Sequence, residues 1–591
     1  MLSPNNDTGW MTGCVLTDAN RGRECLRRSI VGGSFARWRP AGLIGPFGQL
    51  NETIREGANE AIVRLPLVDN GERAHNPVGI GESLWDRQTT PTVGEADVET
   101  EPNDKRLPDN GTVRRSTLEV HFKLFGTDGV SLQSQELSKA LGARGWRAYP
   151  CASDLPSHAE GLMLPELSYQ SPDAVALRKR IFSTGEDSSP ASDGDSLVRE
   201  IVERAEPIRR QVEDYVEALK IPLLHVRNIM SLPYNLPATL ALYNLATDRS
   251  DIGFLMQHHD IYWEGPNSKS FLTPFEQIND LMDRIMCPSL PNARHVLINP
   301  VAAEALRARK GIVGTVVPDG FDFDRDVPVI DDIAFRTEVE IMVGDPRPVG
   351  PDDLIVAMPA RIAINKAIEL AIQFVAALSR ERTALENAPD GLGLNRRQFG
   401  KSSSVVLLLP QGEDLEDNRP YFERLLSYAQ QLGIKLAYGG NIVVPDRRFE
   451  AGDRDHYPFY GTYRAVDLVC YPPEHEGFGN QAIETVWARR PLVVLEYPVF
   501  KRFVRDHIPH YISLGDTEQL GRLAEFGGLH QLRHDYLDVA VNRAITVLTD
   551  HDLERRWTNE NFTALRAFCG MDTVAAEYIR QYTELEEGFG T

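Results

Sequence analysis

Short apolar runs alternate with amphipathic stretches along most of the chain. The run at residues 117–125 predicts a β-strand, and the spacing at 132–144 predicts a helix that ends at Gly145. The same alternation recurs in both halves of the chain after residue 116. We therefore predict an α/β protein with parallel sheets that are covered by helices on both faces.

The same patterns predict the remaining elements. Further strands are expected at 221–226, 252–257, 314–317, 354–358, 405–409, 434–438, 466–471 and 491–495, and further helices at 301–309, 365–380, 421–432, 481–489 and within 537–585. Residues 1–115 lack this pattern and are rich in Pro, Gly, Asn, Asp and Arg. We expect them to form a poorly ordered N-terminal extension and linker.

Composition narrows the class of protein. A chain of 591 residues is too long for one core and suits two large domains. The formal net charge of −22 argues against a nucleic-acid partner, because phosphate binding needs a basic surface. No apolar stretch approaches the length of a membrane span, and no signal-peptide pattern precedes the first domain. The six scattered cysteines are typical of free thiols, so we expect a cytoplasmic location.

One segment carries the strongest chemical signal. Glu476 and Glu484 are separated by seven residues, and a Gly-Phe-Gly turn separates the first glutamate from the helix predicted at 481–489. Gly477 and Gly479 allow a ligand to approach the backbone, and the helix N-terminus offers N–H groups to a diphosphate. The two carboxylates can accept hydrogen bonds from hydroxyls at the two ends of a sugar–diphosphate–ribose ligand. The segment therefore predicts nucleotide-sugar binding.

This segment resembles the Glu-x7-Glu signature of retaining glycosyltransferases of family four, which have two Rossmann-like domains facing a central cleft (the GT-B type). The resemblance implies that Glu476 faces the donor hexose and Glu484 the ribose. The strings Gly-Thr-Asp-Gly-Val-Ser at 126–131 and His-His-Asp-Ile-Tyr-Trp-Glu at 258–264 are similar to mannosylglucosylglycerate synthase-like members. The implied organisation is an extension (1–115), an acceptor domain (116–335), a donor domain (336–550) and C-terminal helices packing back across both (551–591).

The resemblance also implies the other half of the donor site. Arg361 and Lys366 follow the strand predicted at 354–358, where family members carry an Arg and a Lys that hold the diphosphate. Cations placed there favour the departure of a negatively charged leaving group. A helix-start ion pair is the structural alternative. Ala367 stands where the family often has glycine.

The remaining candidates come from the first domain and from the signature turn. The resemblance implies a histidine or similar polar residue near residues 258–264 that hydrogen-bonds the donor hexose. His259 is the candidate and His258 the less favoured alternative, and only one of them can face the cleft, because adjacent residues on a strand point in opposite directions. A histidine with backbone partners, and plain core packing of the aromatic residues, stay open as alternatives. Further donor-binding candidates are Phe478, Asn480, Gly126 and Gly129, and acceptor-side candidates are Asp128, His225, Asn228, Asp260, Tyr262 and Trp263.

These residues lead to one expected activity and two alternatives. We expect retaining transfer of a hexose from a GDP- or UDP-hexose to a small polar hydroxyl acceptor, such as a glucosylglycerate-like compound. A disaccharide phosphorylase of the same fold, or a non-catalytic sugar-nucleotide-binding regulator, would fit the same residues. No metal site is predicted, because Asp322-Phe-Asp324 belongs to a turn, although a divalent cation stays open. The expected partners are small molecules, and the oligomeric state stays open.

Overall fold

The computed structural model describes residues 115–125, 129–182, 193–264, 270–412, 415–446, 449 and 455–589. The predicted N-terminal extension, up to residue 114, lies outside the described residues. The same is true of Gly126 and of Asp128.

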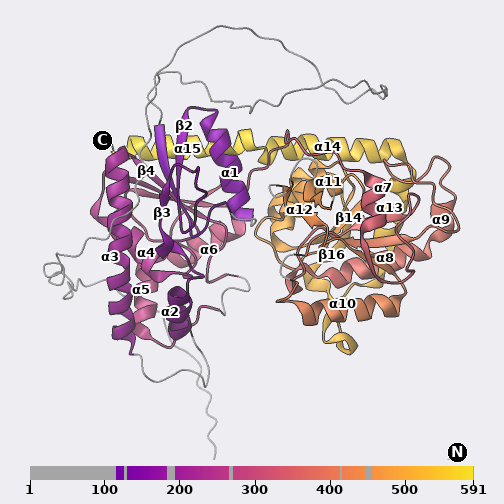
Figure 1. Ribbon diagram of the computed structural model, residues 1–591, viewed down its shortest axis with the longest axis horizontal. Helices are drawn as coiled ribbons and strands as arrows, with labels where there is room; N and C mark the ends of the chain where they lie inside the picture. The colour runs from indigo at the N-terminus through magenta and orange to yellow at the C-terminus, as the bar shows by residue number, and fades with distance from the viewer. Residues whose placement is uncertain are drawn as a thin grey trace, which may run out of the picture. The chain divides into compact units, whose positions relative to one another are not determined.

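The first sheet has seven strands, all parallel, in the order β3-β2-β1-β4-β5-β6-β7. They are β1 (Arg115–Val120), β2 (Trp146–Ala152), β3 (Leu162–Met163), β4 (Leu223–Arg227), β5 (Gly253–His258), β6 (Ala293–Leu297) and β7 (Thr315–Val316). Its helices are α1 (Gly129–Gly142), α2 (Pro172–Phe182), α3 (Gly194–Leu219), α4 (Leu236–Asp248), α5 (Glu276–Ile285) and α6 (Pro300–Lys310) (Figure 1). The strand order reverses between β1 and β4, as in Rossmann folds.

The second sheet also has seven strands, in the order β16-β15-β14-β9-β10-β11-β8, and only β8 is antiparallel to its neighbour. They are β8 (Glu340–Val343), β9 (Leu354–Ala357), β10 (Val405–Leu409), β11 (Lys435–Tyr438), β14 (Leu468–Tyr471), β15 (Leu492–Glu496) and β16 (Ile512–Asp516). Two small two-stranded sheets pair β12 (Val443–Val444) with β13 (Tyr457–Pro458) and β17 (Gly521–Leu523) with β18 (Leu529–Gln531). The helices are α7 (Asp332–Glu338), α8 (Ile368–Arg380), α9 (Arg382–Glu386), α10 (Arg419–Leu432), α11 (Phe459–Thr462), α12 (Asn480–Trp487) and α13 (His534–Thr549). Here the order reverses between β9 and β14.

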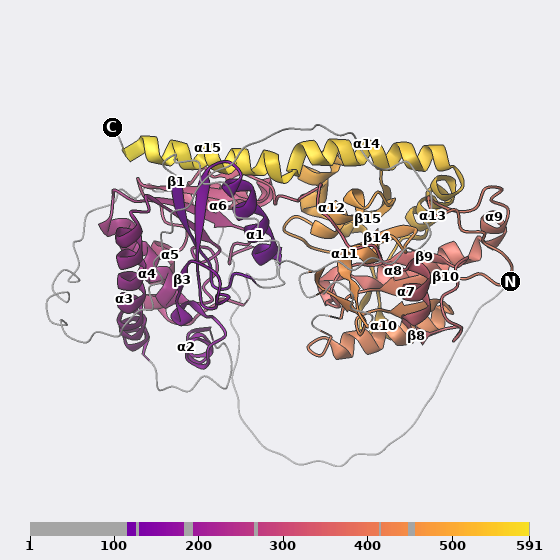
Figure 2. The same ribbon diagram turned by 45° about the horizontal axis from the view of Figure 1, so that its top comes forward.

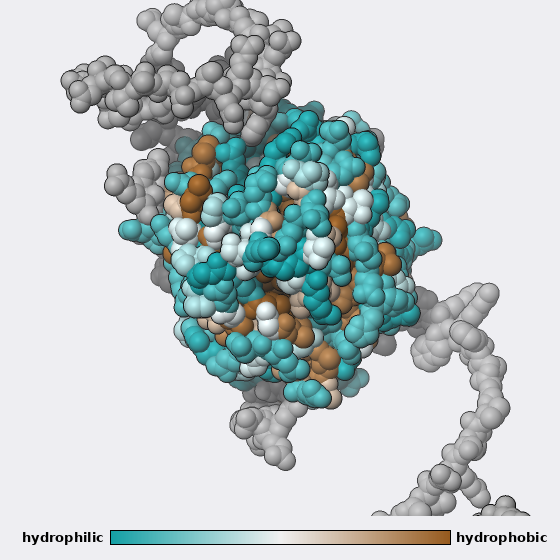
Figure 3. Space-filling model, turned by 90° about the vertical axis from the view of Figure 1, so that its right-hand side faces the viewer, coloured by the Kyte–Doolittle hydropathy of each residue, from teal (hydrophilic) through white to brown (hydrophobic). Residues whose placement is uncertain are grey.

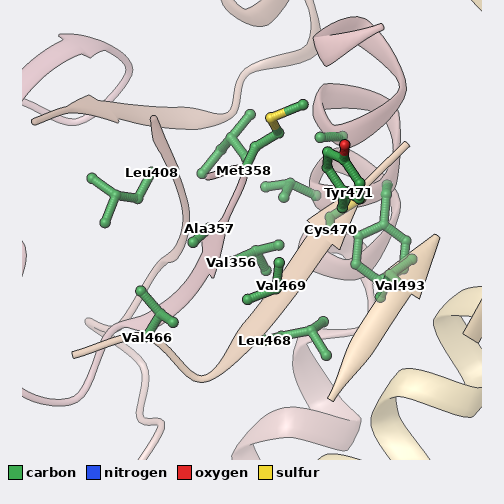
Figure 4. Close-up of a cluster of buried hydrophobic side chains, with 14 of the residues drawn as sticks. Val356, Ala357, Met358, Leu408, Val466, Leu468, Val469, Cys470, Tyr471 and Val493 are labelled. Atoms are coloured by element: carbon green, nitrogen blue, oxygen red, sulfur yellow. The ribbon is translucent and has the colours of Figure 1, made fainter. Parts of the chain in front are cut away.

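Both sheets confirm the predicted α/β class with Rossmann-like organisation. Central strands such as β9, β10 and β14 are almost entirely apolar and buried, because helices cover both faces of a parallel sheet. Figure 4 shows this core in the second sheet, where Val356 and Ala357 of β9 lie beside Val469 and Cys470 of β14. On the face drawn in Figure 3, hydrophilic side chains predominate and hydrophobic ones form small patches. Among the described helices, none combines the length and the apolar character that a membrane crossing requires.

Two long C-terminal helices follow the second sheet. α14 (His551–Cys569) packs on α12 and α13, and α15 (Met571–Phe589) packs on α1 and β5 of the first sheet (Figures 1 and 2). Tyr578 and Tyr582 of α15 are fully buried there.

The helix predicted over 365–380 is interrupted at Ala367, directly after Lys366. The helix expected over 365–380 is instead a 3-10 turn (Ile364–Lys366) followed by α8 from Ile368. Ala367 between them has a left-handed backbone, with φ of 48°. A residue with a Cβ adopts this conformation at a cost of about 1–2 kcal/mol, which gives a physical reason for a glycine at this position.

Candidate functional site

The loops that follow β9 and β14 meet where the strand order of the second sheet reverses. Lys366 Nζ and Glu476 Oε1 form an ion pair, and both side chains are largely buried. The backbones are joined too, because the Glu474 N–H donates to the Asn365 carbonyl at 2.9 Å. In open α/β sheets ligands bind at such a switch point, outside the carboxyl ends of the strands. Lys366 and Glu476 therefore occupy the expected binding edge. Arg361 lies on the same loop and is exposed to solvent.

The signature turn requires glycine at position 479. Gly479 has φ of 103°, and a Cβ there would lie 1.9 Å from Tyr497 Oη. Tyr497 donates a hydrogen bond of 2.7 Å to the Phe478 carbonyl, which fixes the turn from behind. The Phe478 side chain is buried and packs against Phe503 and Phe568. The side chain of Phe478 is therefore not available to a donor, and only its backbone can face a ligand.

Glu484 lies deeper than Glu476. Its side chain is buried on α12 and accepts a 2.8 Å hydrogen bond from the Tyr463 hydroxyl. Burial raises the pKa of Glu484 to about 7, while Tyr463 and the positive charge of Arg325 oppose the shift. Sequence reasoning missed Tyr463 and Arg325, because neither belongs to a motif and both reach Glu484 through the tertiary fold.

Two helix N-termini converge beside this turn. A Cβ on Gly129, the first residue of α1, would lie 3.2 Å from Asn480 Nδ2 at the start of α12. Each helix start offers unpaired N–H groups and the positive end of a helix dipole. The juxtaposition makes a place suited to an anion.

His259 reaches the same turn from the first sheet. Its N–H donates to Asn228 Oδ1 at 2.8 Å, and its Nε2 lies 3.2 Å from Asp319 Oδ1. A Cβ on Gly477 would be 3.4 Å from the His259 carbonyl, and Asn299 Nδ2 donates to the Gly477 carbonyl at 2.8 Å. Asn228 thus braces the strand end, and its own φ of 56° is one that asparagine tolerates better than most residues.

His258 and Asp260, on either side of His259 in the sequence, have different surroundings. His258 is fully buried, and its Nε2 lies 2.9 Å from His295 Nδ1, so only His259 turns towards the signature loop. Part of the Asp260 side chain is accessible to solvent, although many protein atoms lie around it. Desolvation raises the pKa of Asp260, and the negative charge of Glu476 raises it further. His259 and His475 lower the same pKa. Asp260 directly follows His259, whose carbonyl lies against Gly477, the residue after Glu476.

Three acceptor-side candidates are packed by other side chains, with His225 and Tyr262 buried and Trp263 half-buried. His225 is buried, with its ring nitrogens 2.8 Å from Tyr582 Oη and from Gln257 Oε1. Tyr262 and Trp263 pack against each other and around the Arg309 guanidinium. The prediction that His225 lines an acceptor site is wrong, because α15 covers it. For Tyr262 and Trp263 the structure favours the alternative of core packing.

A second polar network behind the loops was not predicted. His530 of β18 lies with Nδ1 2.8 Å from Glu369 Oε1 and with Nε2 3.2 Å from Glu474 Oε2. Glu369 also accepts from the Tyr421 hydroxyl at 2.6 Å, and that hydroxyl accepts from the Ile368 N–H at 3.0 Å. His530 thus links the start of α8, next to Lys366, with the signature loop. Within the described ranges, no cluster of three or more His, Cys, Asp or Glu side chains could hold a metal ion.

Comparison with known proteins identifies relatives, although no family model matches the chain. The mannosylglucosylglycerate synthase of Petrotoga mobilis is 28% identical over 446 residues, which are 74% of this chain and 96% of that protein. The mannosylglucosylglycerate synthase of Thermotoga maritima is 27% identical over 444 residues, which are 75% and 94% of the two chains. A sucrose-phosphate synthase structure from Thermosynechococcus elongatus covers 80% of this chain and 99% of its own, at 15% identity and a TM-score of 0.48. Over about three quarters of its length the chain is similar to mannosylglucosylglycerate synthases, which confirms the resemblance to glycosyltransferases predicted from its sequence.

Proposed function

We propose that this chain is a retaining glycosyltransferase. It moves a hexose from a nucleoside diphosphate sugar, with GDP- and UDP-hexoses as candidates, to a small polar hydroxyl acceptor such as a glucosylglycerate-like compound. The observation that carries the proposal is the contact between Lys366 and Glu476 at the switch point of the second sheet. The names of the two relatives support the same class of reaction.

The ion pair suits a site that receives a diphosphate. In the structure Glu476 neutralises Lys366. A bound diphosphate would replace the carboxylate as the partner of Lys366 and leave Glu476 to accept hydrogen bonds from hexose hydroxyls. The N-termini of α1 and α12 and the side chain of Arg361 would add positive potential. These groups would stabilise the negative charge that develops as the diphosphate leaves.

The transfer itself needs no dedicated basic side chain. The bond from the anomeric carbon to the diphosphate oxygen breaks, and a bond from that carbon to the acceptor oxygen forms on the same face. The leaving diphosphate oxygen takes the acceptor proton. His259 and Asp260, beside Glu476, would orient the hexose, and Glu484 would hold the ribose after its hydrogen bond with Tyr463 rearranges.

Nucleotide binding tests this proposal. We would record the melting temperature of the full chain with GDP, UDP and ADP and with their hexose conjugates. A ligand at about 100 times its Kd adds about 2.7 kcal/mol to the free energy of unfolding, which a melt resolves. We expect one nucleotide to give a selective rise that Lys366→Ala abolishes and that the exposed control Lys401→Ala keeps. A rise with inorganic phosphate or free sugar but with no nucleotide would contradict the proposal.

A further inference from the structure

Two tyrosines lie face to face at the carboxyl edge of the first sheet. Tyr169 precedes α2 and Tyr234 follows β4, with ring centroids 5.1 Å apart and ring planes at 26°. Both rings are only partly buried. The buried Phe122, from the loop after β1, packs against both at 5.6 and 6.0 Å. The pair therefore forms a supported aromatic surface, and hydrophobic core covers only part of it.

Two side chains hold this surface in place by bonding to its backbone. Arg178 Nη1 donates to the carbonyls of Tyr169 and Tyr234, at 2.8 and 3.1 Å. The buried Asn235 donates from Nδ2 to the Glu166 carbonyl at 2.8 Å, and its Oδ1 caps α4. These hydrogen bonds join residues that are 56 and 69 positions apart in the sequence and fix the two segments to each other. Such preorganisation reduces the entropy that a ligand-binding surface loses on binding.

The pair stands at a second switch point, close to the donor loops. Phe122 follows β1 and Tyr234 follows β4, the strands between which the order of the first sheet reverses. Asp260 follows β5, the next strand. The Tyr262 N–H donates to the Ser231 carbonyl at 3.0 Å, which joins the loop after β5, where Asp260 lies, to the loop after β4 that carries Tyr234. Asp260 directly follows His259, whose carbonyl would lie 3.4 Å from a Cβ on Gly477, so this loop connects the aromatic pair to the signature turn.

We propose that Tyr169, Tyr234 and Asp260 form the acceptor subsite and that its ligand is a neutral saccharide ring. A sugar ring has an apolar C–H face, which packs on an aromatic surface, and a rim of hydroxyls. The Asp260 carboxylate can accept hydrogen bonds from those hydroxyls. The inference rests on the proposed glycosyltransferase function and names its acceptor class.

The test is steady-state transfer by the full chain, with GDP-mannose as donor and glucosylglycerate as acceptor. We expect Tyr234→Leu, which keeps apolar volume but removes the aromatic face and hydroxyl, to raise the acceptor KM about tenfold. The donor KM should change less than about twofold. Tyr234→Phe should raise the acceptor KM by only about threefold, because it removes one hydrogen bond. The matched control is Tyr243→Leu, a partly buried tyrosine on α4 that packs against the same core.

The outcomes separate this inference from the proposed function. An unchanged acceptor KM in Tyr234→Leu, or equal rises for Tyr234→Leu and Tyr243→Leu, would overturn the subsite while transfer by the natural chain stands. If the natural chain shows neither transfer nor nucleotide binding, the proposed function fails. The subsite is then tested by saturation-transfer NMR with glucosylglycerate alone. Signal lost in Tyr234→Leu and kept in Tyr243→Leu supports the subsite, and equal signals or none from the natural chain overturn it.

Discussion

The two sheets hold their candidate binding loops by different means. In the second sheet, charged and polar side chains join the loops, through Lys366 with Glu476 and through His530 with Glu369. In the first sheet, aromatic packing and hydrogen bonds to backbone carbonyls place Tyr169 and Tyr234. A charged ligand can replace one partner of an ion pair, whereas a neutral sugar ring packs on a fixed aromatic surface. The difference fits our proposals that the second sheet binds the charged donor and the first sheet the neutral acceptor.

The largest expected effect comes from removing the charge of Glu476. Glu476→Gln leaves Lys366 without its carboxylate and weakens the hydrogen bonds to the hexose. Loss of a charge-assisted hydrogen bond costs roughly 1.5–3 kcal/mol, so kcat/KM should fall by about one to two decades. Initial rates of transfer measure this. Glu423→Gln, an exposed position on α10, should leave the rate unchanged. A full rate in Glu476→Gln would remove Glu476 from the site.

Gly479→Ala should damage the donor side almost as strongly. The new methyl would meet Tyr497 Oη and would sit on a backbone of positive φ, and such conformations cost about 1–3 kcal/mol. We expect a lower melting temperature and weaker nucleotide binding in calorimetry. Adding Tyr497→Phe should recover part of the loss, because it removes the clash but not the backbone strain. Gly142→Ala, with nothing within 4 Å of its Cβ, is the control. Equal behaviour of the two alanine variants would contradict the account of the turn.

His530 tests whether the polar network positions the donor loops. His530→Ala leaves the buried Glu369 without its imidazole partner, which should cost about 1–3 kcal/mol of unfolding free energy. It should also raise the Kd for the nucleotide and leave the acceptor KM unchanged. His530→Gln, which can still donate to Glu369, should restore part of the affinity. An effect on stability alone, with unchanged nucleotide affinity, would make the network purely structural.

The smallest effect is a pH dependence of stability. Burial raises the pKa of Glu484 to about 7 and that of Glu554 on α14 to about 8. A carboxyl that binds its proton more tightly when folded contributes stability in full below its unfolded pKa, and this contribution is lost as pH rises towards 7 or 8. Thermal melts between pH 5 and 9 should therefore show a decline that Glu484→Gln and Glu554→Gln each reduce. Only Glu484→Gln should also change nucleotide affinity. No change in slope would contradict these pKa directions.

The donor side was readable from the sequence because its chemistry is local. Lys366 and Glu476 each follow an apolar run that forms a buried strand, and neighbouring parallel strands end at the same edge. The resemblance to family four implied that both residues belong to the donor site, and the pairing of β14 with β9 brings their two loops together. The turn at Ala367 was not predicted, because a left-handed alanine contradicts the helical pattern around it.

The acceptor side depends on contacts that no local pattern shows. Tyr169 and Tyr234 come together only because Arg178 and Asn235 join their segments. His225 lies within β4, whereas His259 follows the end of β5, and α15, from the far end of the chain, covers His225. Side chains near a strand end are therefore candidates only until the covering helices are known.

One measurement tests the central claim most directly. The full chain is incubated with a nucleoside diphosphate hexose and glucosylglycerate, and the mixture is followed by NMR. The account predicts equimolar release of the nucleoside diphosphate and a new glycosidic anomeric signal with the configuration of the donor, both lost in Glu476→Gln. Release of a hexose phosphate only when inorganic phosphate is present, or a product of inverted configuration, would contradict it.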